Sequence, residues 1–127
     1  FGLEELGLTM KGPFLAVDAQ CRTSMRGVFA IGDVTGRLLL AHVASAQGVT
    51  AVEHIAGLEP PALDYEMMPR ATYCNPQVAS FGLTEEQATE RGHEVKVGRF
   101  PISASGKALG LGEPTHIRFG KYELCPG

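Results

Sequence analysis

Closely spaced cysteines are missing from this 127-residue chain. Its three cysteines, Cys21, Cys74 and Cys125, lie far apart, with no Cys-x-x-Cys spacing and no histidine at the distance typical of a zinc site. This spacing excludes a zinc-binding motif and a redox-active pair of neighbouring cysteines. We interpret the three side chains as reduced thiols of an intracellular protein. A disulfide between two of them is the alternative.

Long apolar runs and clusters of basic charge are also scarce. No stretch approaches the roughly 20 apolar residues that a membrane-spanning helix needs, and no secretion signal is recognisable at the start. The net charge is −3 without a basic patch, which argues against nucleic-acid binding through phosphate neutralisation. With 44% hydrophobic and 20% charged residues, the composition is that of a soluble globular protein of about one domain.

A glycine-rich dinucleotide motif is the third absence. No Gly-x-Gly-x-x-Gly occurs, so the turn that cradles a dinucleotide pyrophosphate is not encoded. The sequence starts at Phe1, without Met and in the middle of a pattern. We therefore expect it to be a piece of a longer reading frame.

The segment from Val28 to His42 is the most informative one present. Residues 28–31 are apolar and lie between two glycines, which predicts a buried strand. Gly32 and Asp33 follow it directly, and a helix is predicted to begin near Leu40. In open α/β sheets, ligands bind at the carboxyl ends of strands, close to such helix starts. The glycine would permit close approach of a ligand, and the aspartate could accept hydrogen bonds from a polyol; an aspartate that caps a turn is the alternative.

The predicted helix runs from about Leu40 to Ile55 and stops at Gly57. Its apolar residues roughly mark one side, namely Val43, Ala44, Val49, Val52 and Ile55. Residues 58–66 contain two adjacent prolines, which break any helix and predict a linker.

A second unit is predicted after the linker. Residues 71–74 and 78–82 are strand candidates on either side of the turn signal Asn75-Pro76. Thr84 and Gln87 match a capping box, which starts a short helix that ends at Gly92. Residues 94–100 alternate polar and apolar and predict a further strand, and residues 117–122 could form another. Strands and a helix in this order are typical of an α+β fold around an antiparallel sheet.

Several of these segments together resemble the pyridine nucleotide–disulfide oxidoreductases, and within that family the dihydrolipoamide dehydrogenase branch most of all. The resemblance begins with Thr23-Ser24, then Gly27-Val28-Phe29-Ala30-Ile31-Gly32-Asp33, then Leu40-Ala41-His42. Downstream it includes residues 69–73, 75–79, 82–85, 97–101 and 107–108. It covers the chain from about Phe1 to Glu113, after which the sequence departs from the family pattern.

The resemblance implies an α+β C-terminal dimerisation domain, with an antiparallel sheet and flanking helices, preceded by a partial α/β flavin-binding segment. Residues 1–57 would be the C-terminal part of the flavin-binding domain, residues 58–66 the linker, and residues 67–127 a truncated interface domain.

The cofactor implied by the resemblance is FAD, with NAD as co-substrate. Gly32 and Asp33 would contact the ribityl chain of the flavin. The backbone N–H groups near Leu40, Ala41 and His42 would face the pyrimidine edge of its ring. No catalytic residue and no metal ligand is expected here, because the family's redox disulfide and its His-Pro-Thr-x-x-Glu segment are absent. His42 is interpreted as a residue of the helix start that packs beside the flavin.

The implied function is oxidation of a dihydrolipoyl group by disulfide, flavin and NAD in turn, in a cytoplasmic homodimer that serves the lipoylated acyltransferase of 2-oxoacid dehydrogenase complexes. By itself this chain is expected to be inactive. One alternative is a self-association module, formed by residues 64–127, without chemistry. Another is a different member of the family, such as a mercuric or glutathione reductase.

Overall fold

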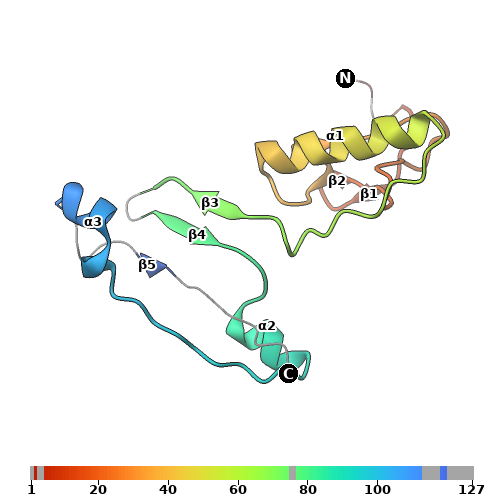
Figure 1. Ribbon diagram of the computed structural model, residues 1–127. Coiled ribbons are helices and arrows are strands. Elements are labelled where there is room, and N and C mark those ends of the chain that lie inside the picture. Colours follow the sequence, from red (N-terminus) through yellow and green to blue (C-terminus); the bar gives the residue numbers. More distant parts are fainter. Residues whose placement is uncertain (1, 3–4, 75–76, 113–117, 120–127) are drawn as a thin grey trace. The chain divides into compact units, whose positions relative to one another are not determined.

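The chain divides into two units, Phe1–Tyr65 and Glu66–Gly127, in the computed structural model (Figure 1). The structure describes residues 2, 5–74, 77–112 and 118–119. The turn signal at residues 75–76 and most of the last predicted strand lie outside these residues.

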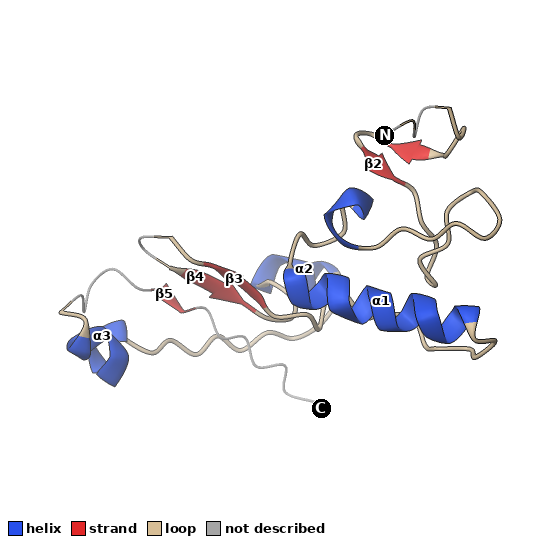
Figure 2. Ribbon diagram, turned by 90° about the horizontal axis from the view of Figure 1, so that it is seen from above, coloured by secondary structure: helices blue, strands red, loops and turns tan. Residues whose placement is uncertain are grey.

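The first unit begins with a small hairpin. Strands β1 (Met10–Lys11) and β2 (Phe14–Leu15) pair antiparallel, with Met10 opposite Leu15 and Lys11 opposite Phe14. A 3-10 helix, η1 (Gly32–Thr35), packs against both β2 and the long helix α1 (Ala41–Ile55) (Figure 2). The predicted start and end of α1 are therefore confirmed to within one residue.

A small apolar core supports this hairpin. Leu8, Leu15 and Ala30 are buried together, and Val17 and Met25 pack against them. The core thus joins the hairpin to the segment that leads into η1, which fixes where that segment ends.

The strand predicted for residues 28–31 does not form. Phe29 makes a single antiparallel bridge with Arg22, flanked by hydrogen bonds from Thr23 N to Val28 O and from Ala30 N to Cys21 O, each 3.0 Å long. A longer strand needs a continuous partner, and in the described part of the chain the pairing with residues 21–23 ends after this bridge. The segment is nevertheless extended and delivers Gly32 to the start of η1.

The buried face of α1 differs from the predicted one. Val49, Val52 and Ile55 are exposed, although they belong to the predicted apolar side. The buried residues are Val43, Gln47, Thr50 and Ala51. Their spacing of four, three and one residues follows a helical face, and half of that face is polar. Hydrophobicity by itself therefore predicted the buried Val43 correctly but not the burial of Gln47 and Thr50.

Gly36 is the glycine with the clearest steric role. It ends η1 with a φ of 66°, and a Cβ built there would lie 2.4 Å from Cγ of Phe14. The ring of Phe14, from strand β2, occupies the space that any larger residue would need. The glycine therefore allows η1 to lie against the hairpin.

The second unit contains a small sheet with the order β3-β4-β5. Strands β3 (Arg70–Thr72) and β4 (Val78–Ser80) pair antiparallel, with Ala71 opposite Ala79, and lie side by side in both views (Figures 1 and 2). Strand β5 (Arg118–Phe119) runs parallel to β4. The α+β class and the predicted positions of β3 and β4 are confirmed.

Helix α2 (Glu85–Glu90) starts as predicted. The hydroxyl of Thr84 accepts the N–H of Gln87 at 3.2 Å, and the side chain of Gln87 accepts the N–H of Thr84 at 3.0 Å, which completes the capping box. Arg91 then caps the helix, and its guanidinium forms two hydrogen bonds with the carboxylate of Glu66. Helices η2 (Ile102–Ala104) and α3 (Gly106–Gly110) follow.

Residues 94–100 form no strand among the described elements, and Lys96 makes only an isolated β-bridge, so the predicted strand does not form. Val97 and Phe100 remain 42% and 71% exposed. An alternating pattern specifies a strand only when a neighbouring strand and a covering layer receive its apolar face. In the described part of the unit, the pairing of this segment is limited to the bridge at Lys96.

None of the helices in the described residues combines the length and apolar character that crossing a membrane would require.

Replacing Gly36 by Ala should destabilise the first unit by about 2–4 kcal/mol, because the residue must keep a left-handed φ and its Cβ would overlap Phe14. Chemical unfolding of the full chain, followed by circular dichroism, measures the loss. Gly57→Ala is the matched control, since Gly57 has a φ of 83° but no atom within 4 Å of its Cβ position. A loss no greater than that of the control would contradict the steric role of Phe14.

Candidate functional site

The predicted site residues Gly32 and Asp33 form the first turn of η1. Gly32 has a φ of 76°, a conformation that glycine adopts without strain. Asp33 is exposed, and its backbone carbonyl accepts the N–H of Gly36 at 3.0 Å. Its carboxylate is therefore presented to solvent from a tight turn of defined shape.

Both backbone polar groups of Gly32 are bound by buried side chains. The Oε1 atom of Gln47, on α1, accepts the N–H of Gly32 at 2.6 Å. The hydroxyl of Thr35 donates to the carbonyl of Gly32 at 2.8 Å. Gln47 is 0% exposed and Thr35 7%. Because its N–H is already bound, Gly32 contributes conformation to the site and not a free donor.

The other predicted site residues lie at the start of α1. Leu40 is the N-cap, and its carbonyl accepts the N–H groups of Val43 and Ala44, each at 3.1 Å. Ala41 and His42 form the exposed beginning of the first turn. The first backbone N–H groups of a helix have no acceptor within the helix, and they carry roughly half a positive charge. The apolar side chain of Leu40 forms no capping hydrogen bond with them, and the partial positive charge of the helix end favours an anionic group there.

These two parts of the predicted site lie close together. A Cβ built on Gly32 would be 3.5 Å from the Cβ of Ala44, one turn into α1. The hydrogen bond between Gly32 and Gln47 joins the same two elements one turn further along. The structure therefore holds the η1 turn, which carries the exposed Asp33, against the first turns of α1.

Sequence reasoning missed the residues that hold this arrangement. The Nε2 atom of Gln47 donates to the hydroxyl of Tyr65 at 3.1 Å. The guanidinium of Arg37 lies over the ring of Tyr65, 5.1 Å from its centroid, and also donates to the carbonyl of Val17 at 2.9 Å. Tyr65 comes from the predicted linker, yet its hydroxyl and its ring face both contact the first unit. The sequence did contain one signal: Gln47 follows Val43 by four residues, a spacing that places both side chains on the same face of a helix.

The loop before this site is shaped by Asp18. Its carboxylate accepts the backbone N–H groups of Gln20 and Arg22, at 2.9 and 3.0 Å, and forms an ion pair with the Arg22 guanidinium at 2.6 Å. Partial burial by itself would raise the pKa of Asp18, but the hydrogen bonds and charge of Arg22 outweigh it and lower the pKa below its ordinary value. This loop positions the Val17 carbonyl that Arg37 binds.

The cysteines do not form a reactive cluster in the described part of the chain. Cys21 is buried as a free thiol, and its burial raises its pKa, which disfavours the reactive thiolate. Cys74 is exposed, and its thiol donates to the carbonyl of Thr72 at 3.7 Å. Cys125 lies outside the described residues. No group of three or more metal-ligating side chains was found among the residues described.

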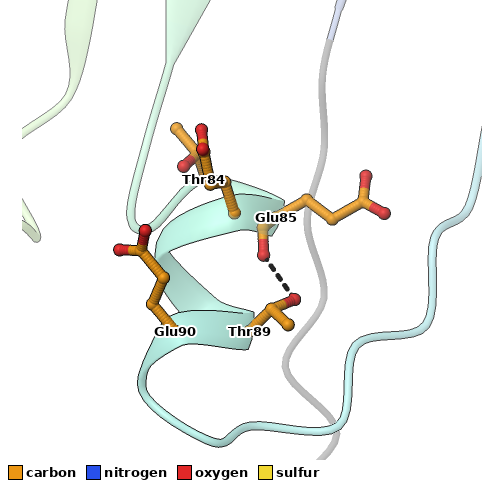
Figure 3. A pocket seen from close by; sticks show the side chains of 5 residues that line it. Thr84, Glu85, Thr89 and Glu90 are labelled. Carbon is orange, nitrogen blue, oxygen red and sulfur yellow. Dashed lines mark hydrogen bonds between the residues drawn. The ribbon is translucent and has the colours of Figure 1, made fainter.

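Two surface hollows lie in the second unit, away from the predicted site residues. One lies on α2, where side chains of Thr84, Glu85, Thr89 and Glu90 surround it and the Thr89 hydroxyl donates to the Glu85 carbonyl at 2.8 Å (Figure 3). The other is bordered by β3, β4 and the start of α3. The first is an open acidic surface, and the second is largely apolar, so neither has the features of the site on η1 and α1.

With this geometry established, comparison with known proteins identifies the class. The pyridine nucleotide-disulphide oxidoreductase family matches residues 1–48, and its dimerisation domain matches residues 68–119. The chain belongs to this family of oxidoreductases.

Within the family, the chain is similar to curated dihydrolipoyl dehydrogenases. It is 58% identical over 118 residues to that of Corynebacterium glutamicum, 52% over 117 residues to that of Mycobacterium leprae, and 48% over 112 residues to that of Bacillus subtilis. The matched regions cover 89%, 91% and 88% of this chain. They cover 25%, 25% and 24% of the relatives, so the chain spans about a quarter of their length.

Solved structures agree on the fold. The chain resembles LpdA from Mycobacterium tuberculosis with a TM-score of 0.71 and 27% identity, over 88% of this chain and 25% of that one. It also resembles RclA from Escherichia coli, described as an HOCl-induced flavoprotein disulfide reductase, with a TM-score of 0.71 and 24% identity, over 85% and 25% of the two chains. The second similarity concerns the fold alone.

Replacing Asp18 by Asn should lower stability at neutral pH by up to about 1 kcal/mol, because Asn keeps the turn acceptor but loses the half-exposed ion pair. A lowered carboxyl pKa stabilises the fold above the ordinary value near 3.8, and this contribution disappears as the pH falls through the lowered pKa. Unfolding of both proteins between pH 7 and pH 2 measures the difference, which should shrink toward low pH. A difference that stays constant over this range would exclude the ion pair as its cause.

Proposed function

We propose that this chain forms one wall of the FAD site, and the beginning of the subunit interface, of a dihydrolipoyl dehydrogenase. The observation that carries the proposal is the rigid placement of the Gly32–Asp33 turn beside the N-terminus of α1. The similarity to dihydrolipoyl dehydrogenases on both sides of the linker supports the choice within the family.

In the proposed site, Asp33 accepts hydrogen bonds from the hydroxyl groups of the ribityl chain. A carboxylate offers two acceptor oxygens, and this one is exposed on a turn whose backbone is already satisfied. Gly32 supplies the left-handed backbone conformation that turns Asp33 outward. These features fit a polyol ligand that lies along the turn.

The N-terminus of α1 is proposed to face the pyrimidine edge of the flavin ring. When bound, a flavin would accept electrons with negative charge developing on that edge, and the backbone at Ala41 and His42 would stabilise that charge through the positive end of the helix dipole. When bound, the flavin supplies the electron transfer itself. The residues of this chain orient it and stabilise its charge. His42 acts through its backbone in this proposal and not as a general base.

The domain boundaries follow from the same proposal. Residues 1–57 belong to the flavin-binding domain and residues 67–127 to the interface domain, with residues 58–66 between them. In the complete enzyme NAD accepts the electrons of dihydrolipoamide, a lipoylated acyltransferase subunit of a 2-oxoacid dehydrogenase complex presents the substrate, and the protein works in the cytoplasm. The shared name of the matched relatives, dihydrolipoyl dehydrogenase, supports the dihydrolipoyl substrate.

Dimer formation through the second unit has its own support. This unit exposes large apolar side chains, among them Tyr73 at 87% of its surface, with Val78, Phe81 and Phe100. Such side chains become an association surface when they lie together in one patch, which is the arrangement proposed here. A homodimer is the proposed partner arrangement. Self-association without chemistry remains the second candidate function, favoured by the same side chains.

The purified 127-residue chain should show no oxidation of dihydrolipoamide above background and no flavin absorbance. No closely spaced cysteine pair and no Gly-x-Gly-x-x-Gly is present in its sequence, so two parts of the catalytic apparatus are missing. Absorbance near 450 nm and an assay of NADH formation measure the two properties. Turnover by this chain without other protein would overturn the division of roles proposed here.

A chimera tests the positive part of the proposal. This chain replaces the matching 118-residue region of the Corynebacterium glutamicum enzyme, and FAD content and dehydrogenase activity are measured. We expect the chimera to bind FAD and to oxidise dihydrolipoamide. Asp33→Ala in the chimera should weaken FAD binding about 10- to 100-fold, as expected for the loss of hydrogen bonds to a charged acceptor.

The matched control is Glu53→Ala, which removes a carboxylate from the distal part of α1. FAD affinity should stay within about twofold of that of the unsubstituted chimera. Glu53→Ala also removes one carboxylate, but at a position distant from the Gly32–Asp33 turn. A folded chimera without FAD, or equal effects of the two substitutions, would overturn the assignment of Asp33.

A further inference from the structure

We infer that Gln47 is the positioning residue of the flavin site, and that Tyr65 from the linker holds the amide of Gln47 in place. This inference rests on the proposed function, because it assigns a role toward the same cofactor. Gln47 does not touch the ligand in this arrangement. It acts through the backbone of Gly32, the residue directly before Asp33.

The first step of the argument is the burial of Gln47. It has the largest fully buried side chain in the described part of the chain. A buried amide without partners would destabilise the fold, so its hydrogen bonds must form whenever the helix packs. Both ends of this amide have a partner: the N–H of Gly32 at 2.6 Å and the hydroxyl of Tyr65 at 3.1 Å.

The second step is the direction of the amide. The backbone N–H of Gly32 can only donate, so it requires the oxygen of Gln47. The nitrogen then faces Tyr65, whose hydroxyl can accept. Stacking of Arg37 on the Tyr65 ring fixes that ring from its face. Arg37 itself is anchored to the carbonyl of Val17. The linker residue Tyr65 is thus tied to the loop before η1 as well as to α1.

The third step is the effect on the ligand side. The peptide groups on both sides of Gly32 are held, one by Gln47 and one by Thr35. Rotation of the Gly32 backbone is what would swing Asp33 away from α1, because glycine has the widest conformational freedom. Gln47 removes this freedom and joins the turn to the same helix whose N-terminus faces the flavin. The orientation of the Gly32 backbone relative to α1 is thereby set before the cofactor binds.

Hydrogen exchange of the full 127-residue chain tests this arrangement without any flavin. The measured quantity is the exchange rate of the Gly32 amide divided by that of the Ala30 amide, whose N–H binds Cys21 and not Gln47. In Gln47→Leu this ratio should rise at least about tenfold. The control is Val43→Ala, a change of equal burial on the same helix. It should leave the ratio of the two amide rates unchanged. An unchanged ratio in Gln47→Leu would overturn the inference.

The chimera described above tests the effect on the cofactor. Gln47→Leu should weaken FAD binding by about tenfold or more, while Val43→Ala should change it less than about threefold even where both lower the melting temperature equally. Gln47→Glu should restore binding to within about threefold, because a carboxylate can still accept from Gly32 and from the Tyr65 hydroxyl. An equal loss of FAD affinity in Gln47→Leu and Val43→Ala would show that Gln47 contributes only to core packing. That result would overturn the inference.

If Gln47→Leu fails to fold, Tyr65→Phe tests the same hydrogen-bond arrangement. It removes one hydroxyl and keeps the ring under Arg37, and we expect it to weaken FAD binding about three- to tenfold and to raise the Gly32 exchange rate. No change in either quantity would contradict the role of Tyr65. If the unsubstituted chimera binds no FAD but Gln47→Leu still accelerates exchange at Gly32, the proposed function fails and the structural link from Gln47 to Gly32 stands.

Discussion

The hydrogen bond from the Gly32 N–H to Oε1 of Gln47 is the interaction on which the candidate site depends. It joins a glycine in a left-handed conformation to a fully buried amide on the long helix α1. A buried N–H that loses its acceptor costs about 1–3 kcal/mol, a considerable part of the stability of a small unit. The packing of α1 and the conformation of the turn therefore form together. As a result, the turn that carries the exposed Asp33 is held against α1.

The surrounding elements hold both partners of this hydrogen bond in position. The hairpin core of Leu8, Leu15 and Ala30 fixes the end of the extended segment that leads to Gly32. Gly36 allows the turn to lie against the ring of Phe14. The hydroxyl of Tyr65 accepts a hydrogen bond from Nε2 of Gln47. The first unit thus extends through the double-proline segment to Tyr65, and the side chains that support the site come from places far apart in the sequence.

Local patterns predicted the parts of the fold that need no distant partner. The capping box at Thr84 and the limits of α1 were correct, because capping and helix periodicity act within a few residues. Strands β3 and β4 were placed correctly on either side of a turn signal. The strands predicted for residues 28–31 and 94–100 were wrong, since an apolar or alternating pattern cannot supply the neighbouring strand that it needs. The buried side of α1 was only partly correct, because the polar Gln47 and Thr50 are buried beside Val43, while Val49, Val52 and Ile55 are exposed.

The sequence by itself determined the family and the residue types at the candidate site, because the motif from Thr23 to His42 carries them in consecutive positions. Only the tertiary structure decided which backbone groups of that motif remain available to a ligand. It assigns the N–H of Gly32 to Gln47 and brings Tyr65 to the same amide. These partners are 15 and 18 residues apart along the chain, and no local pattern links them. Their pairing arises because buried polar groups must find one another when the helix packs.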